Sequence, residues 1–115
     1  MSPTQDDFID GSNVRTVELA QAGDGEAFTS LVRHFEGGIY GYLAGLVGND
    51  EEAHDLTQDT MLRAWQKLPT LQDVSRFKPW LYSIARNLTY DHLRQRQRRK
   101  KRASWQSWER GTMKL

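Results

Sequence analysis

The sequence contains no cysteine, and it has only three histidines and three prolines among 115 residues. Without cysteine, a disulfide framework and a thiolate metal site are both excluded. His34, His54 and His92 lie far apart and do not form a zinc-ligand pair at a common spacing. We therefore expect neither a metal ion nor another cofactor.

Long apolar runs are missing too. Hydrophobic residues make up 37% of the chain, and no run approaches the roughly twenty residues that a membrane-spanning helix needs. The first twelve residues, MSPTQDDFIDGS, lack the basic start and the apolar stretch of a secretory signal. These absences predict a cytoplasmic protein that does not enter a membrane.

Catalytic patterns are absent from the sequence as well. We find no nucleophile triad, no pair of carboxylates in a cleft pattern and no phosphate-binding glycine loop. The short Gly23-Asp24-Gly25 string is too small to count as such a loop. We therefore do not expect an enzyme.

Charge is present in both signs but is unevenly distributed. Residues 1–60 contain twelve acids and two bases, whereas residues 61–115 contain three acids and fourteen bases, so the halves carry about −10 and +11. The basic half favours a polyanionic partner, and the acidic half does not. The alternative is that the two halves simply attract each other.

Apolar periodicity predicts an all-α fold, a compact bundle of about four helices. We expect these helices at about 14–21, 24–47, 49–68 and from 75–78 to 101. Asp24 is expected to cap the second helix and Gly48 to end it, and Asn49 with Glu52 forms an arrangement close to a capping box at the start of the third. The first is expected to pack as a flap. Residues 1–13 are expected to be a flexible N-terminus, and residues 103–115 a linker or tail.

Each of the three longer predicted helices has one stripe of core candidates. The middle of the second helix also contains several glycines. Gly37, Gly41 and Gly45 share a face, which predicts either the close approach of another helix or, as the alternative, a kink or break near Gly37-Gly38. The core candidates are Phe28, Leu31, Val32, Phe35, Ile39, Tyr42, Leu43 and Leu46, then Ala53, Leu56, Thr60, Met61, Ala64, Trp65 and Leu68, and finally Leu81, Ile84, Ala85 and Leu88, with His92 as a further candidate.

Four strings carry a resemblance to a known family: AGDGEAF at 22–28, AHDLTQDTMLRAW at 53–65, FKPWLYSIARNL at 77–88 and YDHLR at 90–94. Over roughly residues 17–99 the chain resembles the promoter-opening domain of bacterial sigma factors of the extracytoplasmic-function group. The resemblance implies a sigma domain 2-like fold over 14–102. It also implies a transcription initiation module that binds core RNA polymerase and helps to melt the minus-ten promoter element.

One face of the third predicted helix is suited to a protein partner. Asp55, Gln58, Asp59 and Leu62 occur at i, i+3, i+4 and i+7, so hydrogen-bond acceptors surround an apolar centre on one solvent-facing stripe. On an isolated helix the usual interpretation would be a solvated acidic face. The resemblance implies that this face binds the coiled coil on the polymerase clamp.

The fourth predicted helix and the loop before it have a composition suited to nucleic acid. Arginines for phosphates alternate there with polar and aromatic side chains that bind or stack on bases. The resemblance places Trp80 at the fork between duplex and single strand, while core packing is the alternative for this residue. The DNA-binding candidates are Asp73, Ser75, Arg76, Phe77, Lys78, Trp80, Ser83, Arg86, Asn87, Tyr90, Arg94 and Arg98.

Residues 94–102 contain seven bases and no acid, which predicts nonspecific attraction to phosphate or, alternatively, a disordered basic arm.

The chain departs from the family in having Met61 where an aromatic is common. No second, helix-turn-helix domain follows, so we expect an isolated or truncated domain. The resemblance also implies an anti-sigma protein as a partner. A helical nucleic-acid-binding or protein-interaction module without any tie to polymerase is the alternative function.

Overall fold

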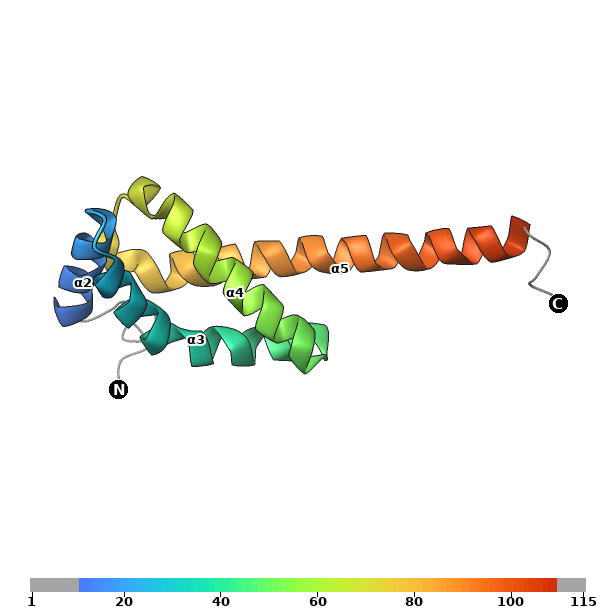
Figure 1. Ribbon diagram of the computed structural model, residues 1–115, viewed down its shortest axis with the longest axis horizontal. Coiled ribbons are helices and arrows are strands. Elements are labelled where there is room, and N and C mark those ends of the chain that lie inside the picture. Colours follow the sequence, from blue (N-terminus) through green and yellow to red (C-terminus); the bar gives the residue numbers. More distant parts are fainter. Residues whose placement is uncertain (1–10, 110–115) are drawn as a thin grey trace.

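The computed structural model describes residues 11–109, with side chains described for residues 13–102. Within this part of the chain, four α-helices and two short 3-10 helices are arranged as an all-helical bundle (Figure 1). This confirms the predicted fold class. The helices are α2 (Gly11–Gln21), α3 (Gly25–Val47), α4 (Asp50–Lys67) and α5 (Phe77–Glu109), and the 3-10 helices η1 (Leu68–Thr70) and η2 (Val74–Arg76) lie between α4 and α5.

Helix α2 is a full part of the core. Val17 and Ala20 are buried, and the side-chain amide of Gln21 donates hydrogen bonds to the carbonyls of Leu68 and Leu71, at 3.2 and 2.7 Å. These bonds tie α2 to the segment that follows α4. The helix begins at Gly11, so residues 11–13 belong to it rather than to the expected flexible end. The remainder of that end, residues 1–10, lies outside the described residues.

Helix α3 begins and ends as its sequence predicts. The Asp24 carboxylate accepts hydrogen bonds from the N–H groups of Glu26 and Ala27, and Gly48 ends the helix in the left-handed conformation. The helix is unbroken from Gly25 to Val47, so the alternative of a break at Gly37-Gly38 is wrong. Its buried side chains recur every three to four residues and include Leu31, Phe35, Ile39 and Leu43.

The glycine prediction was wrong about which residue another helix approaches. A β-carbon at Gly37, Gly41 or Gly45 would meet open space. At Gly38 it would meet the hydroxyl of Tyr82, which comes from α5. The close approach is therefore between Gly38 and the side chain of Tyr82. It is not an approach between the backbones of two helices.

Two aromatic residues predicted to be buried lie at the surface instead. Trp65 is 36% exposed and Tyr42 is 37% exposed. Each borders the core and contacts one aromatic ring, Phe28 in the case of Trp65 and Tyr82 in the case of Tyr42. Periodicity placed both on the core stripe, but they lie at its edge, where a large ring remains partly in solvent.

Helix α5 is longer than predicted. It continues to Glu109, eight residues past the expected end at Lys101, because residues 94–109 contain neither glycine nor proline to stop it. Most of the tail predicted as a linker is therefore helical, and residues 110–115 lie outside the described part. Figure 1 shows α5 extending well beyond the other three helices. The first half of α5 packs in the bundle, and the basic half extends away from it.

Candidate functional site

The predicted protein-binding face of α4 is on the surface. Asp55, Gln58, Asp59 and Leu62 are all exposed, and Leu62 is 58% exposed. On the opposite side of the helix, Ala53, Leu56, Thr60 and Ala64 are buried, which fixes the orientation of α4. Gln58 also lies 3.2 Å from the ring nitrogen of His54. The face therefore presents two carboxylates and an amide beside an unusually exposed leucine.

An apolar cavity continues this face toward α3. It has a volume of about 280 Å³ and is lined by Gly25, Phe28, Met61, Leu62 and Trp65. The rings of Phe28 and Trp65 pack with centroids 4.9 Å apart and form one wall. The sequence did not predict this cavity, because the helical periodicity of Phe28 and Trp65 indicated that both rings lie in the core. The apolar part of the surface is consequently larger than Leu62 alone.

The predicted stripe on α5 faces solvent. Arg86, Asn87, Tyr90 and Arg94 are exposed. Ser83 is half-buried, and its hydroxyl donates to the carbonyl of Trp80 at 2.7 Å. On the other side of α5, Leu81, Ala85 and Thr89 are buried. The stripe combines two guanidinium groups with an amide and a phenol. These groups suit phosphate binding, hydrogen bonding to base edges and stacking.

The loop before α5 is organised around Asp73. Its carboxylate accepts hydrogen bonds from the Ser75 hydroxyl at 2.6 Å and from the Ser75 N–H at 3.1 Å. The bond from the Ser75 hydroxyl, and after it the bond from the Ser75 N–H, holds the pKa of the Asp73 carboxyl below its usual range. Asp73 and Ser75 therefore fix the shape of the loop. Arg76, the last residue of η2, is exposed at the end of the same turn.

Phe77 requires a correction. It is 1% exposed and packs between Phe35 and Trp80, with ring centroids 5.4 and 5.8 Å away, so it is a core residue and cannot touch DNA in this conformation. As the first residue of α5 it points inward and anchors the helix. Trp80 and Lys78 are half-buried. Trp80 packs against the core and stays partly accessible, so core packing is observed and its place at the fork stays a prediction.

The basic half of α5 contains the last two DNA-binding candidates. Arg94 and Arg98 are exposed, and so are Arg99, Lys100, Lys101 and Arg102. Arg94 forms an ion pair with Asp91 three residues earlier on the same helix. One side of the helix cannot hold this many cations, so they surround it. A surface of this kind attracts polyanions through its field rather than through a single fitted contact.

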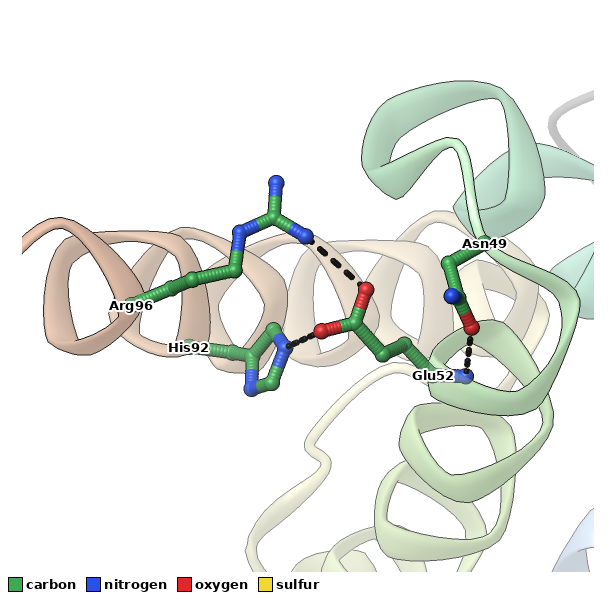
Figure 2. Close-up of polar contacts among 4 residues, drawn as sticks. All are labelled: Asn49, Glu52, His92 and Arg96. Atoms are coloured by element: carbon green, nitrogen blue, oxygen red, sulfur yellow. Dashed lines mark hydrogen bonds and ion pairs between the residues drawn. The ribbon is translucent and has the colours of Figure 1, made fainter. Parts of the chain in front are cut away.

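A polar link connects α4 to α5. Glu52 accepts a hydrogen bond from His92 at 3.0 Å and another from Arg96 at 2.8 Å (Figure 2). The bond from His92, together with the charge of Arg96, lowers the pKa of the Glu52 carboxyl below its ordinary value. Asn49 caps α4 by accepting from the Glu52 N–H at 2.9 Å. The sequence predicted the cap, but not that the Glu52 side chain would turn away from it toward α5.

Metal and membrane motifs give no further site. Among the described side chains, those of residues 13–102, no group of three or more histidine, aspartate or glutamate residues could hold a metal ion. None of the helices within residues 11–109 is long and apolar enough to cross a bilayer. The two helix faces, on α4 and on α5, are therefore the features that function must explain.

Comparison with known proteins identifies a family that this chain matches. The family model for Sigma-70 region 2 matches residues 31–99. The sigma factor BldN of Streptomyces coelicolor, an ECF RNA polymerase sigma factor, is 42% identical over 79 residues, which cover 68% of this chain and 30% of BldN. SigW of Bacillus subtilis, of the same group, is 32% identical over 82 residues, or 71% of this chain and 44% of SigW. The chain thus spans less than half the length of these two relatives.

A solved structure is also similar. It is the NMR structure of an engineered region 2 of sigmaE in complex with GTAAAA. The TM-score is 0.71 at 28% sequence identity, and the match covers 86% of this chain and 97% of the other. The family is not one of enzymes. This chain therefore belongs to the Sigma-70 region 2 family, and it matches the region 2 portion of sigma factors of the extracytoplasmic-function group.

Proposed function

We propose that this domain acts in transcription initiation by binding core RNA polymerase through α4 and the minus-ten promoter element through α5. The observation that carries the proposal is that one helical body presents two chemically opposed surfaces. Acceptors surround the exposed Leu62 on α4, whereas cationic, amide and aromatic groups line α5. A protein partner with Arg or Lys groups suits the first surface, and unpaired DNA suits the second.

For the α4 face, the proposed partner is the coiled coil of the polymerase clamp. Asp55 and Asp59 would pair with its basic side chains, and Leu62 would make an apolar contact with the coiled coil beside these pairs. An exposed apolar residue ringed by polar groups is the usual anatomy of a small protein interface. We propose the same surface, including the exposed ring of Trp65, as the site where an anti-sigma protein would compete.

For α5, the proposed ligand is the non-template strand of the minus-ten element. Unstacking a base costs a few kcal/mol, and stacking on an aromatic side chain returns about 1–3 kcal/mol per base. Tyr90 and the accessible side of Trp80 offer such stacking surfaces, and Arg86 offers a phosphate contact beside them. The solved relative in complex with GTAAAA supports this assignment. Both partners imply that the protein works in the cytoplasm.

Charge reversal on α4 tests the polymerase half of the proposal. Asp55→Lys and Asp59→Lys should each abolish capture of the domain by immobilised core polymerase, because each replaces an acceptor by a like charge. Glu36→Lys is the control, since Glu36 is an exposed acid on α3, outside this face. Equal capture of all three variants and the unaltered chain would instead favour a nucleic-acid-binding module with no tie to polymerase.

Arg86→Ala tests the DNA half. It should weaken binding to a single-stranded minus-ten oligonucleotide more than binding to a scrambled strand of the same length. A screen of random single strands supplies the preferred sequence first. An equal loss on both strands would mean that Arg86 contributes only charge, and specific readout by α5 would have to be abandoned.

A further inference from the structure

A second cavity lies between the end of α3 and the middle of α5. It has a volume of about 480 Å³, within the range of small-molecule sites. Leu46 of α3 and Leu93 of α5 form its apolar part, and Tyr90 stands at its edge. Its polar part comes from Gln97 and three basic side chains, Arg94, Arg96 and Lys100. None of the described residues that line it is acidic.

Two carboxylates outside this cavity hold its arginines in place. Glu52 accepts from Arg96 at 2.8 Å, and Asp91 pairs with Arg94. Ordering a long arginine side chain costs conformational entropy, and the less exposed pair with Glu52 meets part of that cost for Arg96 before any ligand arrives. Lys100 adds a third positive charge one turn of helix further on. The cavity is thus lined by three cationic side chains, of which Arg96 is ordered by Glu52, and by two leucines.

We propose that this cavity binds one unpaired nucleotide of a DNA strand, with its base against Leu46 and Leu93 and its phosphate at the basic rim. Nucleotides combine a flat, largely apolar ring with an anion, and the cavity offers surfaces for both. Tyr90 provides a ring for stacking, and the Gln97 amide can donate to and accept from the edge of a base. Gln97, Lys100 and Leu46 lie outside the stripe already assigned to α5.

This inference rests on the proposed function, because Tyr90 and Arg94 belong both to the cavity and to the α5 stripe. A strand that crosses the stripe would pass directly over the opening. The cavity would then give one base position a specificity that the exposed stripe does not provide. Gln97, the side chain best placed to read that base, becomes a specificity-determining residue.

Two neighbouring glutamines provide the test. Gln97 lines the cavity, whereas Gln95 is exposed on the same helix and does not line it. Gln97→Glu and Gln95→Glu alter the net charge equally, so the difference between them isolates the cavity from the general field. The probe is the tightest-binding six-nucleotide single strand selected from a random pool, titrated by fluorescence anisotropy.

We expect Gln97→Glu to lose at least about fivefold more affinity than Gln95→Glu, a difference typical of one lost base contact. Removing the base at one position of the strand, and at that position only, should abolish the difference. NMR signals of the Leu46 and Leu93 methyl groups should shift with the strand but not with free deoxynucleoside monophosphates.

Three results would overturn the inference while leaving the proposed function intact. The first is an equal loss of affinity in Gln97→Glu and Gln95→Glu. The second is a difference in affinity between these variants that removal of no single base abolishes. The third is a shift of the Leu46 and Leu93 methyl signals with free nucleotides alone. The second would indicate a phosphate contact without a bound base. If no single strand binds the unaltered chain, the proposed function itself fails, and the cavity assignment fails with it.

Discussion

The hydroxyl of Tyr82 on α5 occupies the space where a β-carbon would lie at Gly38 of α3. Burial raises the pKa of this phenol, and its ring packs on Tyr42 with centroids 5.6 Å apart. The contact limits how closely α5 can approach α3 at this point. It also explains why glycine is needed at one position of α3 and not at its neighbours.

A pair of glycine substitutions tests this relationship. Gly41→Ala should raise the free energy of unfolding by about 1 kcal/mol, because its β-carbon meets open space and alanine favours the helix. Gly38→Ala should raise the free energy of unfolding by less than this amount, or lower it, since the Tyr82 ring must move. Urea denaturation measures both. Adding Tyr82→Phe should restore the gain at position 38, and an equal gain for both single variants would contradict the contact.

The Glu52 link predicts a dependence of stability on pH. Because the pKa of this carboxyl is lowered in the fold, its contribution is fully present above the ordinary value of 4.5 and is lost as the pH falls below it. Glu52→Gln should therefore lower the free energy of unfolding at pH 7, and the difference from the unaltered protein should shrink toward pH 3. Denaturation series at several pH values measure this change.

Glu51 provides the matched control for that experiment. It precedes Glu52 in the first turn of α4, so both carboxylates meet the same helix dipole, but Glu51 is exposed. Glu51→Gln should leave the pH profile close to that of the unaltered chain. If the two variants had the same profile, the effect would come from the helix end and not from His92 and Arg96.

Buried Thr89 predicts a stabilising substitution. Its hydroxyl has no hydrogen-bond partner among the described residues, although the side chain is fully buried. Thr89→Val keeps the shape and removes the unsatisfied group, so the free energy of unfolding should rise by about 1 kcal/mol. Thr60→Val is the contrast, because the Thr60 hydroxyl donates to the Leu56 carbonyl at 2.7 Å and its loss should destabilise. Thermal unfolding by calorimetry distinguishes the two.

The basic half of α5 predicts how binding depends on salt. If about five phosphates are neutralised, the affinity for single strands should fall with salt at a log–log slope near −3.5, or about 0.7 per phosphate. Lys101→Ala combined with Arg102→Ala should reduce the steepness by about 1.4, since both cations are exposed. Binding isotherms between low and moderate salt give the slope. An unchanged slope would place the phosphates elsewhere.

The sequence predicted the features that repeat along a helix. Helix spacing correctly placed Asp55 and Leu62 on one exposed face of α4, and Arg86 and Tyr90 on one face of α5. It also predicted the caps at Asp24 and Asn49, because capping depends only on neighbours in the chain. What these faces bind remains a prediction.

Features that depend on distant residues could not be predicted in this way. Glu52 and His92 are forty residues apart, and only the crossing of α4 over α5 brings them together. Phe77 was predicted to bind DNA with the loop before α5 because it follows that loop directly. Its inward direction is set by the register in which α5 begins against Phe35, which no local pattern reports.

Because α5 is one helix from Phe77 to Glu109, the direction in which each basic side chain points is fixed relative to the bundle. Each residue advances the axis by about 1.5 Å and turns it by about 100°. A one-residue deletion between Arg94 and Arg98 would swing the later cations to another side of the rod. An insertion of seven residues would keep their bearing and carry them about 10 Å outward, roughly three base pairs along a duplex. The length and continuity of the helix thus set both the distance of the cations from the bundle and their direction. Footprinting of phosphates on bound DNA would measure the shift caused by such a deletion or insertion.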